Sequence, residues 1–77
     1  MDTLTALGRF DGKYVGARDV AALMDGTTPK EAGLNGRSVV VARELRRLIR
    51  DDLAAKDYGP RPSCLYAITD KGKASLS

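Results

Sequence analysis

The sequence predicts one small α+β domain, with helices first and a β-hairpin near the C-terminus. Residues 37–52 lie within the longest run without Gly or Pro, and their apolar side chains recur at helical spacing. Residues 64–69 (CLYAIT) instead alternate with the period of a strand, directly after a segment that contains two prolines. A chain of 77 residues can build only one core, so residues 1–77 are expected to form a single domain.

The N-terminal part begins with a short predicted helix over residues 3–10, whose apolar side chains share one edge. Asp2 or Thr3 is the expected N-cap, because either side chain can accept a hydrogen bond from a free backbone N–H group. Gly12 then favours the end of the helix, since glycine adopts left-handed backbone conformations easily. Residues 13–15 are expected to form a short extended piece, at most a minimal strand.

A second helix is predicted over residues 17–25, with a face of small and apolar side chains that supports the core. The run Thr28-Pro29-Lys30-Glu31 then has the pattern of a capping box with proline at the first helical position. It predicts one short helical turn over residues 29–32, which stops at Gly33. Leu34 is expected to anchor this segment to the core.

The helix over residues 37–52 is expected to have two different faces. The buried stripe contains four aliphatic residues: Val41, Leu45, Leu48 and Ile49. The opposite side contains four arginines and two valines: Arg43, Arg46, Arg47, Arg50, Val39 and Val40. The net charge of the chain is +3, and residues 37–50 alone contain five arginines and one glutamate. The positive excess therefore lies on one helix, as expected for an element that faces a partner. Asn35 or Ser38 is its expected N-cap.

Residues 53–56 and 64–69 are predicted to pair as a β-hairpin. Its turn falls at residues 58–63, because two prolines and a glycine cannot continue a ladder of backbone hydrogen bonds. Tyr66 is expected to face the core, and residues 70–76 are expected to end the chain with a short helix.

Three segments resemble the winged helix-turn-helix regulators of bacteria. LRRLIRDDLAAK (45–56) is similar to the passage from their recognition helix into the first wing strand. YAITDKGKASL (66–76) resembles the second wing strand and its exit in the MarR and PadR groups, and YVGARDVAALM (14–24) resembles the first helix of the helix-turn-helix unit. The resemblance implies a small winged helix-turn-helix fold, with about three to four helices and a C-terminal two-stranded wing.

The chain departs from that family pattern in three places. Asp52 stands where a glycine usually closes the recognition helix. The connection over residues 25–36 has about a dozen residues, where a turn of three or four is usual. The long extra helices through which MarR-like and PadR-like proteins dimerise are missing from this sequence. We therefore expect either a homodimer with a different interface or a monomer.

The resemblance implies sequence-specific binding of double-stranded DNA by a small transcriptional regulator of a prokaryote or a phage. The recognition helix, residues 37–52, would enter the major groove, and the wing, residues 56–64, would lie on the backbone or in the minor groove. The expected DNA contacts are Arg37, Ser38, Val39, Val40, Arg43, Arg46, Arg47, Arg50, Lys56 and Arg61. Arg50 is expected to bind phosphate, and Lys56 and Arg61 on the wing are expected to reach the backbone or the minor groove, which positions the protein without specifying the sequence.

Val39 and Val40 leave two explanations open, because valines on a polar face either contact thymine methyl groups or pack against residues 28–34. Exposed valines, together with the long insert and the modest net charge of +3, also suit an alternative function. In that alternative the domain is a winged-helix protein-interaction module, an adaptor or small inhibitor, that docks through its arginine face and the insert at residues 25–36.

Enzymatic, metal and membrane functions have little support in the sequence. There is no histidine, Cys64 is the single cysteine, and no Gly-rich phosphate loop is present. No apolar run approaches the ~20 residues that a membrane span needs, and the N-terminus lacks the pattern of a signal peptide. We therefore expect a cytoplasmic protein that is not an enzyme, with no cofactor, no metal and no membrane partner.

Overall fold

The computed structural model describes residues 1–57 and 65–76. This part of the chain forms five helices and one two-stranded antiparallel sheet, which confirms the predicted α+β class and the predicted order of elements. The elements are α1 (Thr3–Gly8), α2 (Ala17–Asp25), α3 (Pro29–Leu34), α4 (Arg37–Arg50), β1 (Ala54–Asp57), β2 (Leu65–Ile68) and α5 (Asp70–Leu76). The estimate of three to four helices was too low, because the segment before α4 and the C-terminal segment both complete helices.

The sheet is centred on β2, which has a neighbour on each side. On one side it pairs with β1, in the register that sets Lys56 opposite Tyr66. On the other side Val15 forms an isolated bridge with Tyr66: the N–H of each residue donates to the carbonyl of the other, at 2.8 Å and 2.7 Å. The predicted extended piece over residues 13–15 therefore contacts the two-stranded sheet through this one bridge. The predicted turn at residues 58–63 lies outside the described residues.

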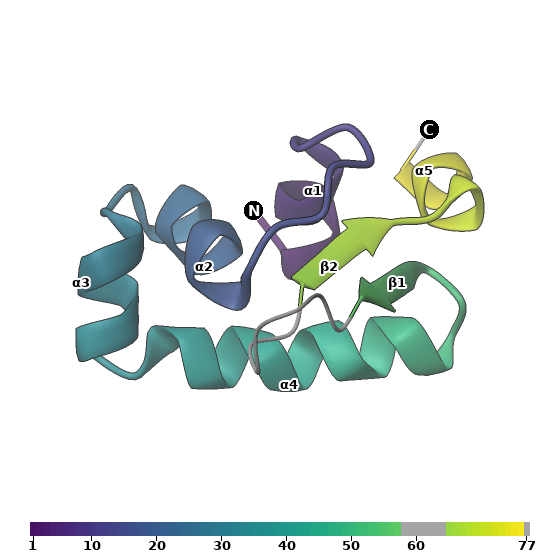
Figure 1. Cartoon of the computed structure of the whole chain (residues 1–77). Helices are drawn as coiled ribbons and strands as arrows, with labels where there is room; N and C mark the ends of the chain where they lie inside the picture. The colour runs from purple at the N-terminus through teal and green to yellow at the C-terminus, as the bar shows by residue number, and fades with distance from the viewer. Residues whose placement is uncertain (58–64, 77) are drawn as a thin grey trace.

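The core lies between α1, α2, α4 and the sheet. Leu7, Val20, Val41 and Leu45 are its largest fully buried side chains, one or two from each of the three helices. Burial of one such side chain stabilises a fold by roughly 1.5–3 kcal/mol. Figure 1 shows the consequence for α4, which runs along one edge of the molecule with α1, α2 and the sheet all on its inner side. The predicted core position of Tyr66 is confirmed, at 4% exposure.

The segment between α2 and α4 differs from the prediction in two respects. The helix α3 continues through Gly33, because the Asn35 N–H still donates to the Glu31 carbonyl at 3.0 Å. The expectation that Leu34 anchors this segment was wrong, since Leu34 is 79% exposed and Ala32 is fully buried instead. Two positions along a helix are rotated by about 200°, so these two side chains point in nearly opposite directions.

The ends of α1 and α4 follow local capping rules. Asp2 is the N-cap of α1, as expected, and its carboxylate accepts from the Thr5 N–H at 2.8 Å. This helix ends at Gly8, two residues before the predicted end. The helix α4 ends at Arg50 rather than at Asp52, and Asp52 itself adopts the left-handed conformation, with a φ of 62°. Aspartate tolerates this conformation better than most residues, so it replaces the usual glycine.

Candidate nucleic-acid interface

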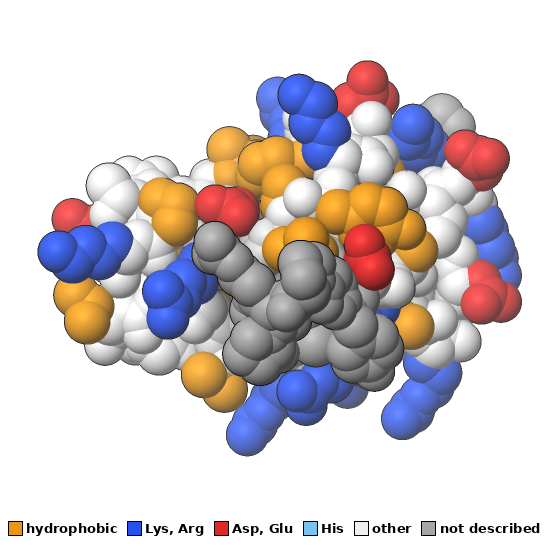
Figure 2. Space-filling view, in the orientation of Figure 1, with side chains coloured by type: hydrophobic (Ala, Val, Ile, Leu, Met, Phe, Trp, Pro, Cys, Tyr) orange, Lys and Arg blue, Asp and Glu red, His pale blue; other side chains and the backbone are white. Residues whose placement is uncertain are grey.

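The outward side of α4 contains four exposed arginines and two exposed valines. We call these residues the arginine face: Arg43, Arg46, Arg47, Arg50, Val39 and Val40. Their inward neighbours Val41 and Leu45 are buried, as the helical spacing predicts. Figure 2 shows Lys and Arg side chains gathered along the lower edge of the molecule, where α4 runs in Figure 1. Packing thus fixes the helix through one side and leaves the basic side free.

The two valines of the arginine face are surface residues. Val39 is 57% exposed and Val40 is 44% exposed. Residues 28–34 therefore do not bury them, although Val39 and Pro29 border the same groove. Of the two explanations that the sequence left open, this exposure favours contact with a partner over packing against α3.

Arg37 was predicted to contact DNA, but the structure gives it another role. Its Nε donates to Asp25 Oδ2 at 2.8 Å and its Nη2 donates to Asp25 Oδ1 at 3.3 Å. This hydrogen bonding raises the pKa of Arg37 above its ordinary value. The ion pair joins the end of α2 to the start of α4 across the insert. The charge of Arg37 is therefore already compensated, unlike that of a free phosphate-binding arginine.

The start of α4 lacks the side-chain cap that the sequence predicted. Gly36 is the N-cap residue, in a left-handed conformation with a φ of 79°. Asn35 contributes nearby, because its side-chain oxygen accepts from the Arg37 N–H at 3.0 Å. Ser38, the other expected cap, is half-buried and borders a groove beside α4.

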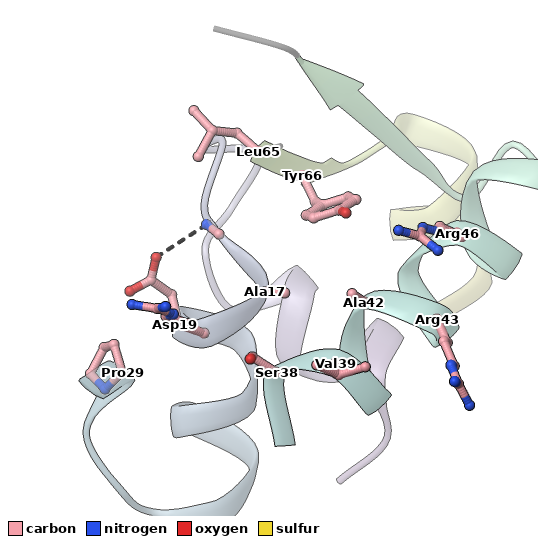
Figure 3. A pocket seen from close by; sticks show the side chains of 12 residues that line it. Ala17, Asp19, Pro29, Ser38, Val39, Ala42, Arg43, Arg46, Leu65 and Tyr66 are labelled. Atoms are coloured by element: carbon pink, nitrogen blue, oxygen red, sulfur yellow. Dashed lines mark hydrogen bonds between the residues drawn. The ribbon is translucent and has the colours of Figure 1, made fainter. Parts of the chain in front are cut away.

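That groove has a volume of about 740 Å³ and runs between α4, β2 and the first residues of α2 and α3. Figure 3 shows Leu65 and Tyr66 of β2 on one side, and Ser38, Val39 and Ala42 of α4 on the other. Three arginines border it, Arg18 from α2 and Arg43 and Arg46 from α4. Its surface thus combines apolar walls with guanidinium groups.

Acidic groups near this surface are engaged in hydrogen bonds of the fold. The Asp19 carboxylate, at the groove, accepts from the Gly16 N–H at 3.1 Å and so caps α2 (Figure 3). Glu44, on α4, accepts a hydrogen bond from the hydroxyl of Thr3, which is itself buried in α1. Each carboxylate keeps its negative charge in these hydrogen bonds, so Glu44 on α4 partly offsets the positive potential of the arginine face.

The remaining predicted contacts lie toward the hairpin. Arg50 is the last residue of α4 and is exposed. Lys56 lies in β1 and is half-buried. Arg61 and Cys64 fall outside the described residues. Arg18 was not among the predicted contacts, but it borders the same groove as Arg43 and Arg46. Its position near the N-terminus of α2 was the signal available in the sequence.

Comparisons of the chain with protein-family models, curated proteins and solved structures found no match. Within residues 1–57 and 65–76, no helix has the length and apolar character to cross a membrane. The same residues contain no group of three or more acidic or cysteine side chains arranged to hold a metal ion.

Proposed function

We propose that this protein binds double-stranded DNA as a small winged-helix transcriptional regulator, with α4 as its recognition helix. The observation that carries the proposal is the arginine face, on which four exposed guanidinium groups project from a helix anchored by its opposite side. A basic stripe on one helix is the usual electrostatic footprint of a nucleic-acid-binding domain. In this proposal the protein comes from a prokaryote or a phage, acts in the cytoplasm and is not an enzyme.

The geometry of α4 supports insertion into the major groove. Its 14 residues span about 21 Å, and a helix with side chains is about 10–12 Å across, close to the ~12 Å width of that groove. The helix lies at an edge of the molecule, where a duplex can approach it (Figure 1). The hairpin that follows α4, with the bridge from Val15 to Tyr66 on its far side, is compatible with a winged helix.

In this proposal, the arginine face divides into reading and positioning residues. Arg43 and Arg47 lie one helical turn apart and would each donate two hydrogen bonds to a guanine. Val39 and Val40, near the N-terminus of α4, would contact thymine methyl groups. Arg50, at the opposite end, would bind phosphate.

A protein-interaction module is the second candidate, and one observation favours it. This observation is that Leu34, on the insert helix α3, is 79% exposed while Val39 and Val40 on α4 are exposed as well, so the insert and the arginine face both carry apolar side chains that a protein partner would cover. In this alternative, Leu34 and the arginine face would bind an acidic protein surface with an apolar centre. The same face would then be unable to bind DNA and that protein together.

Selection of bound duplexes from a random-sequence library tests the proposal against the alternative. We expect the wild-type chain to enrich a consensus, and Arg43→Ala to relax it at one position, because a bidentate arginine–guanine pair contributes about 1–3 kcal/mol of discrimination. Arg9→Ala, which removes the same charge from the end of α1, serves as the matched control and should leave the consensus unchanged. Failure to enrich any sequence, together with capture of one stoichiometric protein that DNA does not displace, would instead support the interaction module.

A further inference from the structure

We propose that the insert helix α3 positions Arg18 as a further phosphate-binding residue at the groove beside α4. The ligand is one phosphodiester of the bound duplex, so this inference rests on the proposed function. Two independent features assign this role to Arg18: the contact between Arg18 and Gly33, and the charge of the groove.

The first feature is the close approach of Arg18 to α3. A side-chain carbon added at Gly33 would lie 2.7 Å from Arg18 Nε and 3.0 Å from Arg18 Cζ. The guanidinium group therefore occupies the space that the missing side chain of Gly33 leaves. Ala32 is fully buried beside Gly33, so α3 itself is held in place. The contact restricts a long side chain that would otherwise sample many rotamers.

The second feature is the composition of the groove that Arg18 borders with Arg43 and Arg46. These three arginines, from two helices, border the groove together with one carboxylate, Asp19, which keeps its charge while it accepts from the Gly16 N–H, so positive groups outnumber negative ones there. A guanidinium group presents a planar fork of N–H donors that matches two phosphate oxygens. Charge complementarity thus favours the backbone of a nucleic acid as the occupant, with Val39 and Pro29 beside its sugars.

These two features explain what the insert contributes. A tight turn of three or four residues between α2 and α4 would place no helix against Arg18. With α3 present, one arginine from α2 is held at the same groove as two arginines from α4. The basic surface is thereby widened from one helix to two without any increase in the length of α4.

The substitution Gly33→Ala tests the positioning directly. Its methyl group would displace the end of a flexible side chain rather than backbone, and alanine favours a helix interior more than glycine does. We therefore expect a melting temperature equal to or above that of the wild type. We also expect affinity for a random-sequence duplex to fall by roughly threefold to tenfold, because one charge-assisted contact is lost.

Arg18→Ala and the double substitution complete the test. Arg18→Ala should weaken binding equally for all sequences and reduce the slope of log K against log salt by about one. Gly33→Ala in that background should cause no further loss, since its effect acts through Arg18. Arg9→Ala, on α1, is the control for the removal of one positive charge outside the groove.

The outcomes separate the two proposals. If Arg18→Ala binds as the wild type does while Arg43→Ala loses affinity, the inference about Arg18 is wrong and the proposed function stands. If Gly33→Ala keeps full affinity while Arg18→Ala does not, α3 does not position Arg18. If the wild-type chain does not bind duplex DNA at low salt, both proposals fail.

Discussion

The guanidinium group of Arg37, at the start of α4, donates two hydrogen bonds to the carboxylate of Asp25, at the end of α2. These residues are the two ends of the segment that contains α3. The ion pair links the two ends of this segment, while the buried side chains of Val20, Val41 and Leu45 hold α2 against α4. This pairing favours a structural role for Arg37 over the DNA contact that the sequence predicts.

Substitution of either partner of this pair distinguishes the two roles. If Arg37 supports the scaffold, Arg37→Ala and Asp25→Asn should both lower the melting temperature slightly, and Arg37→Ala should weaken DNA binding less than Arg43→Ala. If Arg37 contacts DNA, Asp25→Asn should free it and strengthen binding. Thermal unfolding and duplex titration of the three variants, side by side, decide between these results.

The leucines Leu34 and Leu45 allow the same substitution at an exposed and a buried position. Leu45 is fully buried, so Leu45→Ala should cost about 2–5 kcal/mol of unfolding free energy through lost burial and a cavity. Leu34 is 79% exposed, so Leu34→Ala should change stability by less than about 0.5 kcal/mol. Urea unfolding measures both values. A large loss at Leu34 would mean that the insert packs on the core after all.

The glycines Gly33 and Gly72 form a second contrasting pair. A side-chain carbon at Gly72 would lie 2.2 Å from the backbone carbonyl oxygen of Leu53, and this oxygen cannot rotate away. Gly72→Ala should therefore destabilise the fold by at least about 1–3 kcal/mol, by forcing α5 away from the end of α4 and the sheet. Gly33→Ala should not destabilise the fold, because its methyl group would contact only a flexible side chain. Equal melting temperatures for the two variants would contradict the packing of α5.

The N-cap of α1 gives a pH dependence with a defined direction. Hydrogen bonds from the side chain and backbone of Thr5 lower the pKa of Asp2 from 3.8. The ionised carboxylate is thus favoured in the folded state. Its contribution to the stability of the fold is present above pH 3.8 and is lost as the pH falls through the lowered pKa of the folded state. Asp2→Ala should cost about 0.5–2 kcal/mol at pH 7, and this difference should shrink toward pH 2. A stability difference between wild type and Asp2→Ala that stays constant over this pH range would mean that the charge of Asp2 does not contribute to stability.

The sequence predicts the elements whose signals are local. The aliphatic spacing of residues 37–52 and the period of two in residues 64–69 each depend on neighbours along the chain, so the presence of α4 and β2 was predicted. The details differ, because α4 ends at Arg50 and Ala67 is buried next to Tyr66. The capping box at Thr28 predicted the start of α3, but not how far the helix continues. Leu34, the last residue of α3, was wrongly assigned to the core. A single leucine does not show which side of a short helix is covered by the rest of the fold.

The features that the sequence does not predict are pairings between distant residues. Arg37 pairs with Asp25 and Glu44 with Thr3, over separations of 12 and 41 residues. Arg18 meets Gly33 only because α3 folds back against α2. None of these contacts follows from a local pattern. They also determine which charged groups have partners within the fold: the sequence lists Arg37 among the expected contacts, whereas the structure pairs it with Asp25.

Equilibrium binding of the full chain to a random-sequence duplex, measured from about 50 mM to 200 mM salt, tests the central claim most directly. If the arginine face binds DNA, log K should fall linearly with log salt. The expected slope is roughly −3, which corresponds to about three neutralised phosphates at about −0.9 each. Arg43→Ala or Arg46→Ala should reduce affinity, and Arg9→Ala should not. Absence of binding at the lowest salt, or an affinity that does not depend on salt, would contradict the claim.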